Sequence, residues 1–176
     1  LIKESNIDVD FFNIGGGFPG EYLGIKKQPL TKYFKVIKNE FLKKFKNSKT
    51  KLLSEPGRVL VSNSMSLVVR VDLRKKNILY INDGTHSFLH DAGKHNFVYP
   101  VKIFKKQKKS KLQPFSFYGP TCDSNDFMEG PFLLPEFTGE GDYLEIEEMG
   151  AYSLSMKNNF NGFFSKPKIF IEEENK

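Results

Sequence analysis

The sequence is poor in the residues and runs that mark several common classes of protein. Its single cysteine, Cys122, excludes an internal disulfide and cannot build a zinc site alone. The three histidines, His86, His90 and His95, lack companions at metal-ligand spacing, so no metal site is predicted. No apolar run approaches the ~20 residues of a membrane span, and no secretory pattern opens the chain. We therefore expect a soluble, cytoplasmic protein with no membrane partner.

Arginine is also scarce, although the net charge is +6. Only Arg58, Arg70 and Arg74 occur, and lysine supplies the rest of the positive charge, mostly within residues 26–51 and 102–111. Arginine binds phosphates and the edges of bases more specifically than lysine does. Acidic residues between 136 and 148 also interrupt any single basic face. The pattern favours a solvated surface, so nucleic acid is not predicted as a partner.

The composition nevertheless supports a folded core. The chain has 176 residues, 39% of them hydrophobic, with 18 Phe and 7 Tyr. This length suits a single core but is too short for a complete (β/α)₈ barrel of roughly 250 residues. Any barrel indicated by the pattern is therefore incomplete.

The first third of the chain predicts a βαβ unit. Residues 9–14 form a short apolar run that stops at glycine, which is typical of a buried strand. Between residues 30 and 45 apolar side chains recur every three or four positions, which predicts an amphipathic helix. Residues 51–54 form a second strand. Strand, helix and strand in this order indicate a parallel sheet, with functional groups at the carboxyl ends of its strands.

The remainder of the chain predicts a β domain. Short β-rich runs are separated by turn residues, at 67–73, 78–81, 97–104, 115–118, 143–147 and 168–171. We expect a hairpin turn at 75–77, a solvated loop at 105–111 and a long irregular segment at 119–139. The predicted fold class is α/β plus all-β. Residues 1–64 form the terminal part of an α/β barrel, and residues 65–176 form an antiparallel β sandwich or barrel.

Each strand of the βαβ unit ends in a turn whose residues could bind a ligand. Gly15, Gly16 and Gly17 follow the first strand, so their backbone N–H groups can approach an anion closely; the alternative is a tight turn that merely needs positive φ. Glu55 and Arg58 follow the second strand on one rigid turn; the alternative is a capped surface turn with an i,i+3 ion pair. Spacing alone leaves both alternatives open.

The loop around the single thiol is a third motif. It places Cys122 beside Asp123 and near Asp126, after a Gly-Pro pair. A neighbouring carboxylate keeps a thiol protonated, which suits a proton donor better than a thiolate nucleophile. The alternative is a buried, inert cysteine. Two further motifs, Gly150-Ala151-Tyr152 and Phe-Asn-Gly-Phe at 160–163, are by themselves a strand end and an aromatic cluster.

Together and in this order, the five motifs resemble the carboxyl-terminal half of the pyridoxal-phosphate-dependent ornithine decarboxylases. These belong to the ornithine/diaminopimelate/arginine decarboxylase group, which has the alanine-racemase-like fold. The run Gly-Pro-Thr-Cys122-Asp123-Ser is the sharpest marker. The diaminopimelate branch usually has Cys-Glu-Ser there, so the resemblance favours the ornithine/lysine branch.

The resemblance implies a pyridoxal 5'-phosphate site. Gly15, Gly16 and Gly17 are expected to hold the cofactor phosphate, aided by Arg58 and the Tyr152 hydroxyl. Glu55 is expected to pair with the pyridine nitrogen and keep it protonated.

The resemblance also implies how the substrate is handled. Cys122 is expected to protonate the α-carbon after decarboxylation. Asp123 and Asp91 are expected to meet the distal ammonium of a diamino acid from two different chains. In the family the cysteine loop enters the neighbouring subunit's site, which implies a homodimer.

One departure from the family pattern concerns the Schiff-base lysine. In the family this lysine lies well before the glycine-rich turn, whereas this chain starts fourteen residues ahead of Gly15. We therefore expect a fragment of a decarboxylase that is inactive alone.

The function predicted for the family member is decarboxylation of ornithine to putrescine, in polyamine biosynthesis. The alternatives are a lysine or diaminopimelate decarboxylase and a non-catalytic binding protein of the antizyme-inhibitor kind. The enzyme is favoured by intact Cys122, Asp123, Glu55 and Arg58, because a pure binding protein has no need for a proton donor or a pyridine partner.

Overall fold

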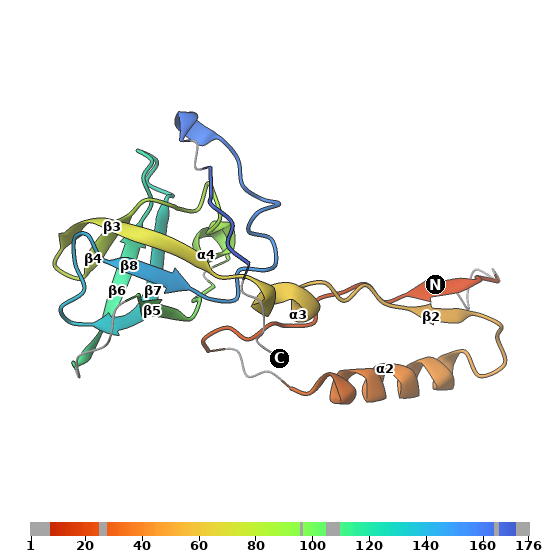
Figure 1. The fold of residues 1–176 in the computed structure, drawn as a ribbon. Helices are drawn as coiled ribbons and strands as arrows, with labels where there is room; N and C mark the ends of the chain where they lie inside the picture. Colours follow the sequence, from red (N-terminus) through yellow and green to blue (C-terminus); the bar gives the residue numbers. More distant parts are fainter. Residues whose placement is uncertain (1–7, 25–27, 96, 105–109, 164–165, 172–176) are drawn as a thin grey trace.

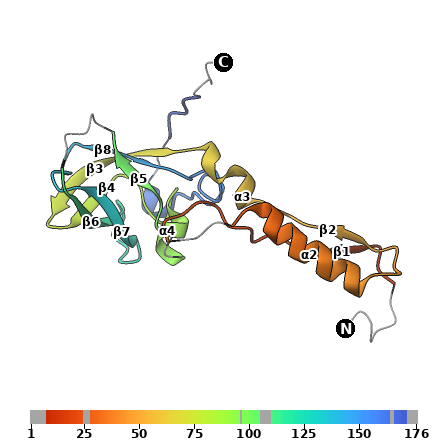
Figure 2. The ribbon, with the colours of Figure 1, turned by 90° about the horizontal axis from the view of Figure 1, so that it is seen from below.

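The structure is a computed structural model that describes residues 8–24, 28–95, 97–104, 110–163 and 166–171. A narrow α/β arm, made of β1 (Phe11–Asn13), α2 (Leu30–Lys44) and β2 (Lys51–Leu53), extends to one side of a curled β sheet (Figure 1). The view from below shows the same separation between the α/β arm and the sheet (Figure 2). The chain segments that connect the α/β arm to the sheet lie between these two parts.

The α/β arm confirms the predicted βαβ unit. Strands β1 and β2 pair in parallel, with Phe12 opposite Leu52, and α2 forms the connection between them. The helix begins at the residue that the apolar periodicity predicts and ends one residue earlier than predicted. The carboxyl ends of both strands therefore lie at the same edge, where the glycine-rich and Glu-Pro-Gly-Arg turns begin.

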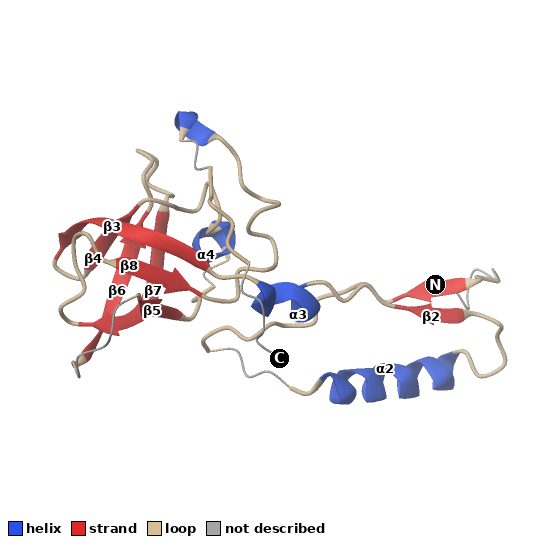
Figure 3. Ribbon diagram, in the orientation of Figure 1, coloured by secondary structure: helices blue, strands red, loops and turns tan. Residues whose placement is uncertain are grey.

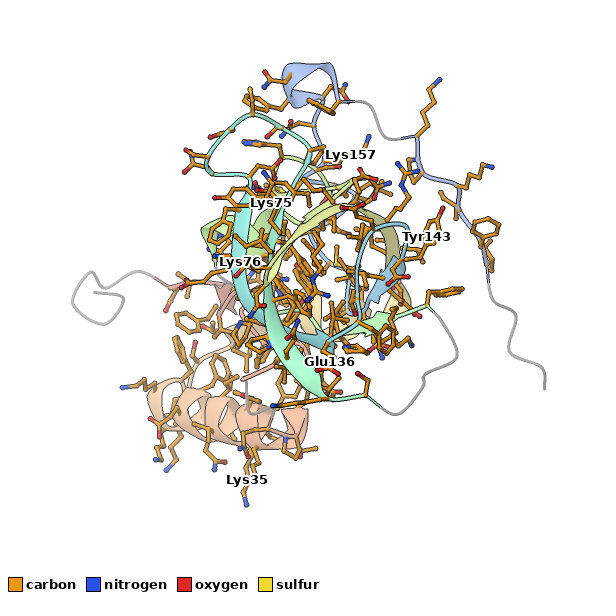
Figure 4. The ribbon with its side chains drawn as sticks, turned by 90° about the vertical axis from the view of Figure 1, so that its left-hand side faces the viewer. Lys35, Lys75, Lys76, Glu136, Tyr143 and Lys157 are labelled. Carbon is orange, nitrogen blue, oxygen red and sulfur yellow. The ribbon has the colours of Figure 1, made fainter. Side chains whose placement is uncertain are left out.

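The apolar face of α2 packs on the small sheet through aromatic rings. The rings of Phe41 and Phe45 stack with centroids 4.8 Å apart, and Phe45 lies 5.2 Å from Phe12. On the opposite side of the helix, Lys35 points away from the molecule (Figure 4). No residue of α2 is fully buried, and Phe11 remains 56% exposed. Within the described residues, the α/β arm thus covers only one face of its short sheet.

The second part is a six-stranded sheet with the strand order β5-β8-β3-β4-β6-β7. It curls until its outer strands β5 and β7 contact each other, which nearly closes a barrel (Figure 3). Neighbouring strands are antiparallel except for β4 and β6, which pair in parallel, so the sheet is mixed. The strands are β3 (Leu67–Lys75), β4 (Ile78–Ile81), β5 (Val101–Ile103), β6 (Leu112–Tyr118), β7 (Phe127–Pro135) and β8 (Tyr143–Ile146).

Alternating apolar residues of these strands fill the barrel interior. Phe117 and Phe132, from neighbouring strands, stack with their centroids 4.0 Å apart. Figure 4 looks into the curled sheet and shows side chains crowding its interior. The fully buried large side chains are Tyr99, Phe115, Phe117, Phe132, Leu79, Ile81, Leu89, Met128, Leu134, Leu144, Ile146 and Met149. This core makes the barrel a rigid support for the loops at its ends.

Three of the predicted features can be compared directly with the structure. The turn at residues 75–77 forms the β3–β4 hairpin, with Lys76 at φ 55°. Strand β7 runs through part of the segment predicted to be irregular, 119–139. Residues 168–171 form no strand, and Phe170 is 84% exposed. Most of the loop predicted at 105–111 lies outside the described residues.

Short helices lie where the α/β arm meets the barrel. The connection after β2 contains α3 (Arg58–Val61) and η1 (Ser62–Ser64), while α4 (His90–Lys94) follows β4 and η2 (Phe160–Gly162) lies near the carboxyl end. The predicted boundary between residues 64 and 65 falls between η1 and β3. Among the described residues, no helix has the length and apolar character needed to cross a lipid bilayer.

Candidate functional site

The glycine-rich turn after β1 is held in a specific shape. Gly15 and Gly17 have positive φ angles of 71° and 83°, which glycine adopts without strain. Gly16 is required for a different reason, because a Cβ there would lie 2.4 Å from the carbonyl oxygen of Glu55. The Asn13 side chain accepts a hydrogen bond from the Gly15 N–H at 2.8 Å. The turn therefore presents bare backbone at the edge of the sheet.

Glu55 ties the ends of the two parallel strands together. Its backbone N–H donates to the Gly15 carbonyl at 2.8 Å, and its Oε1 accepts from the Asn13 amide at 2.7 Å. The Glu55 side chain is exposed and lines a cavity of about 590 Å³. This volume is within the range of about 300–1,000 Å³ typical of small-molecule sites.

Arg58 begins α3 and lines the cavity. Its guanidinium donates to the Tyr22 hydroxyl at 2.9 Å and to Asp91 Oδ2 at 2.6 Å. The rings of Phe97 and Tyr152 lie 4.9 and 4.6 Å from the guanidinium carbon. Burial alone would lower the pKa of Arg58, but the hydrogen bonds to Tyr22 and Asp91 outweigh it and raise that pKa. Arg58 is thus a fixed cation between aromatic rings.

The barrel side of the molecule also contributes residues to the lining of this cavity. Asp91 lies in α4 with its side chain 5% exposed, and Tyr152 follows β8 with a left-handed backbone at φ 57°. Tyr152 OH lies near Gly57, where an added Cβ would be 3.9 Å away. Residues from four separate segments therefore converge on one cavity: Gly16, Gly17, Phe18, Pro19, Gly20, Tyr22, Glu55, Gly57, Arg58, His90, Asp91, His95, Phe97, Tyr152 and Met156.

Cys122 and Asp123 lie on a different surface from this cavity. Cys122 is exposed, so the alternative prediction of a buried, inert thiol is wrong. Its Sγ accepts a hydrogen bond from the Asn161 amide at 3.3 Å. Asp123 pairs with His86 at 2.8 Å. The backbone N–H of Asn125 and, next, the His86 side chain hold the pKa of Asp123 below its usual value. Neither Cys122 nor Asp123 lines the cavity of its own chain.

A buried carboxylate, Asp126, fixes the loop that carries Cys122. Its Oδ1 accepts from the Thr85 N–H at 2.7 Å, and its Oδ2 accepts from the Thr121 N–H at 3.1 Å and hydroxyl at 2.7 Å. Side chains at Gly84 and Gly119 would collide with it, because their Cβ atoms would lie 2.1 and 2.2 Å from Asp126 Oδ1. The loop therefore projects Cys122 and Asp123 from a rigid base.

Sequence reasoning missed several residues of the cavity. Tyr22, Phe97 and Met156 lie in segments without a motif, and only their position in the fold brings them to Arg58. The view that the histidines lack companions is also wrong for two of them, since ligand atoms of His90, Asp91 and His95 lie within 4.8 Å of one another. Their spacing along one short helix was the available signal.

A family model describes the greater part of the chain. Residues 26–150 match the model of the pyridoxal-dependent decarboxylase, C-terminal sheet domain. Antizyme inhibitor 2 of Xenopus laevis is 33% identical over 95% of this chain and 40% of its own length. Ornithine decarboxylase of Caenorhabditis elegans is 30% identical over 94% of this chain and 42% of its own length. The chain thus spans about two fifths of the length of these relatives.

Solved structures show the same fold. Diaminopimelate decarboxylase of Helicobacter pylori complexed with L-lysine matches with a TM-score of 0.71 and 28% identity, over 91% of this chain and 39% of that one. The structure of SrLDC in complex with PLP and cadaverine matches with a TM-score of 0.72 and 26% identity, over 92% and 42%. Both likenesses extend across the α/β arm and the barrel.

Proposed function

The chain belongs to the pyridoxal-dependent decarboxylase family, and on that premise we propose that it forms part of an enzyme that decarboxylates ornithine to putrescine. The observation that carries this proposal is the convergence of the glycine-rich turn, Glu55, Arg58 and Tyr152 on one cavity of about 590 Å³. Each of these groups offers a contact that a phosphorylated, nitrogen-containing aromatic ring requires.

The residues of the cavity fit pyridoxal phosphate. A Cβ at Gly15 or Gly17 would meet no atom within 4 Å, so the turn leaves open space beside its backbone for an anion. Arg58 and the Tyr152 hydroxyl supply further donors for the phosphate, and the Glu55 carboxylate would hold a proton at the pyridine nitrogen. When bound, pyridoxal phosphate supplies the electron sink for the loss of carbon dioxide.

The substrate is proposed to meet residues of two chains. Asp91 lies in the cavity wall and Asp123 on the separate loop, so one chain by itself does not bring both carboxylates to one cavity. In a homodimer the loop of one protomer would reach the cavity of its partner. Asp91 and Asp123 would then bind the distal ammonium, and the Cys122 thiol would donate a proton to the substrate α-carbon.

Two observations support specific alternatives. The 33% identity with antizyme inhibitor 2 favours a non-catalytic binding protein. The likeness to diaminopimelate decarboxylase in complex with L-lysine favours a larger diamino acid. Against the first stands the set of Cys122, Glu55 and Arg58, because a binding protein needs neither a thiol donor nor a partner for a pyridine nitrogen.

A chimera tests the function. This chain replaces the matching part of the Caenorhabditis elegans ornithine decarboxylase, and carbon dioxide release is measured with ornithine, lysine and diaminopimelate. Turnover of ornithine that is lost on Glu55→Gln would support the proposal, and turnover of another diamino acid would assign that substrate instead. A chimera that binds pyridoxal phosphate and dimerises but decarboxylates none of the three favours the binding protein.

A further inference from the structure

We propose that His90, Asp91 and His95 form a binding site for one divalent transition-metal ion of the zinc class, at the edge of the cavity. The three residues belong to α4 and the residue that follows it, and their ligand atoms lie within 4.8 Å of one another. In a tetrahedral zinc site with bonds of about 2.1 Å, ligand atoms lie roughly 3.4 Å apart. A contraction of at most roughly 1.4 Å between ligand atoms therefore converts the observed cluster into a metal site.

Two of the three ligands are already positioned relative to each other. The Asp91 carbonyl accepts hydrogen bonds from the N–H groups of both His95 and Phe97, at 3.2 and 3.1 Å. These bonds close the end of the short helix and hold residue 95 beside residue 91. His95 Nε2 lies 3.9 Å from Asp91 Oδ1, so a small rotation of the imidazole brings both atoms to bonding distance of one ion.

The carboxylate is oriented by a partner outside the cluster. Arg58 engages Asp91 Oδ2 at 2.6 Å, which leaves Oδ1 facing His95 as a single-oxygen ligand. Metal-binding carboxylates are commonly fixed by such outer hydrogen bonds, which reduce the freedom lost on binding. The positive charge of Arg58 also weakens the attraction for a cation, so we expect moderate affinity.

The ring nitrogens of the two imidazoles are available as metal ligands. Among the described residues, neither ring makes a hydrogen bond, and their contact is edge-on with centroids 6.3 Å apart. The His95 side chain is 52% exposed, and its ring lies 6.1 Å from the ring of Phe97. Two imidazoles and one carboxylate form a donor set for Zn²⁺, Co²⁺ or Ni²⁺, whereas Mg²⁺ and Ca²⁺ prefer oxygen ligands. A fourth position is left for water.

The test titrates the 176-residue chain with Zn²⁺ by calorimetry, in the presence of a competing chelator. We expect one Zn²⁺ per chain, an affinity that falls at least about tenfold in both His90→Ala and His95→Ala, and no response to Mg²⁺. Because metal must displace protons from imidazole, binding should weaken as the pH falls. In proton NMR spectra, the imidazole signals of His90 and His95 should shift, and that of His86 should not.

The third histidine supplies the matched control. His86 stacks on Phe160 and pairs with Asp123, outside the cluster, so His86→Asn should leave the affinity for Zn²⁺ unchanged. His95→Ala is the decisive variant because its exposed side chain contributes little to the fold. Saturable binding that survives this substitution, or equal loss in His86→Asn, overturns the proposal, as does the absence of any saturable site in the folded chain.

Discussion

Arg58 and Asp91, 33 positions apart in the chain, form a charge-assisted hydrogen bond of 2.6 Å that joins α3 to α4 across the cavity wall. Their side chains are only 17% and 5% exposed. The same guanidinium also contacts the rings of Tyr22, Phe97 and Tyr152. The pair therefore connects the segment after β2 to the barrel. It links the stability of the fold to the shape of the site.

Arg58→Met should destabilise the chain strongly. The substitution leaves the Asp91 carboxylate buried without its partner, which typically costs about 3–5 kcal/mol. The matched control is Arg70→Met, because Arg70 pairs with Asp72 on the surface with side chains 52% and 41% exposed. That pair should contribute only about 0–1 kcal/mol. Urea unfolding measures both, and equal losses in the two variants would contradict this role of the Arg58–Asp91 pair.

Asp126→Asn should loosen the loop that carries Cys122. Asp126 is completely buried and accepts hydrogen bonds from Thr85 and Thr121, which an amide cannot all replace. Loss of hydrogen bonds to a charged group costs about 1.5–3 kcal/mol. Hydrogen exchange should show faster opening around residues 119–126. Asp72→Asn, at an exposed carboxylate, is the control. It should change neither the free energy of unfolding nor the hydrogen exchange of residues 119–126.

Asp83 should make stability fall as the pH rises from about 4 to about 6. Burial raises the pKa of Asp83 to about 6, although N–H groups of Gly84 and Phe88 hydrogen-bond its carboxylate. Between the unfolded pKa near 4 and this value, the folded chain binds more protons than the unfolded chain, so deprotonation favours unfolding.

The measurement for Asp83 is urea unfolding at several pH values. The contribution of Asp83 to the free energy of unfolding should fall by about 2–3 kcal/mol by pH 6. Asp83→Asn removes the titrating group while retaining an acceptor oxygen. The difference in free energy of unfolding between the two proteins should therefore change between about pH 4 and about pH 6 and be constant above it. A difference that does not vary with pH would show that folding does not raise the pKa of Asp83.

Local patterns predicted more of the fold than of the site. The α2 periodicity is a property of consecutive residues, so its bounds were predicted to within one residue. Strand β7 was missed because Gly130 and Pro131 interrupt it; a strand at the end of the order, next to β6, tolerates proline. Residues 168–171 have strand-like composition but no strand beside them, and β structure requires a partner.

The site residues likewise fall into those that a local motif identifies and those that only the fold brings together. The glycine-rich turn and the Glu55–Arg58 turn are short motifs, and both were identified from the sequence. The Arg58–Asp91 pair joins distant segments, so no local pattern indicates it. The same holds for His86, which reaches Asp123 from 37 positions away.

Cys122→Ala should slow turnover in the chimera without weakening cofactor binding. The thiol is exposed and lies outside the cavity of its own chain, so its removal leaves the glycine-rich turn and Arg58 unchanged. A positioned proton donor contributes roughly 10²–10⁴-fold to rate. Stopped-flow kinetics and the absorbance of bound pyridoxal phosphate separate the two effects. Unchanged rates and products would remove Cys122 from the reaction.

Asp123→Ala should raise the Michaelis constant for ornithine and act across the dimer. Its side chain is 24% exposed and pairs with His86, and the lowered pKa keeps the carboxylate anionic. Loss of one charge-assisted contact to an ammonium costs about 1.5–3 kcal/mol, or roughly 10–150-fold. The steady-state rates of the chimera and its variant give this ratio directly.

Mixed dimers decide whether Asp123 serves its own subunit or the neighbouring one. One protomer carries Asp123→Ala, and the other lacks the cofactor-binding lysine in the barrel segment supplied by the relative. If the sites are shared, each mixed dimer has one site in which the intact lysine of the first protomer meets the intact Asp123 of the second, so ornithine turnover returns. If Asp123 acts within its own chain, no site contains both groups. Mixing without recovered activity, while labelled subunits demonstrably exchange, would therefore refute the shared site.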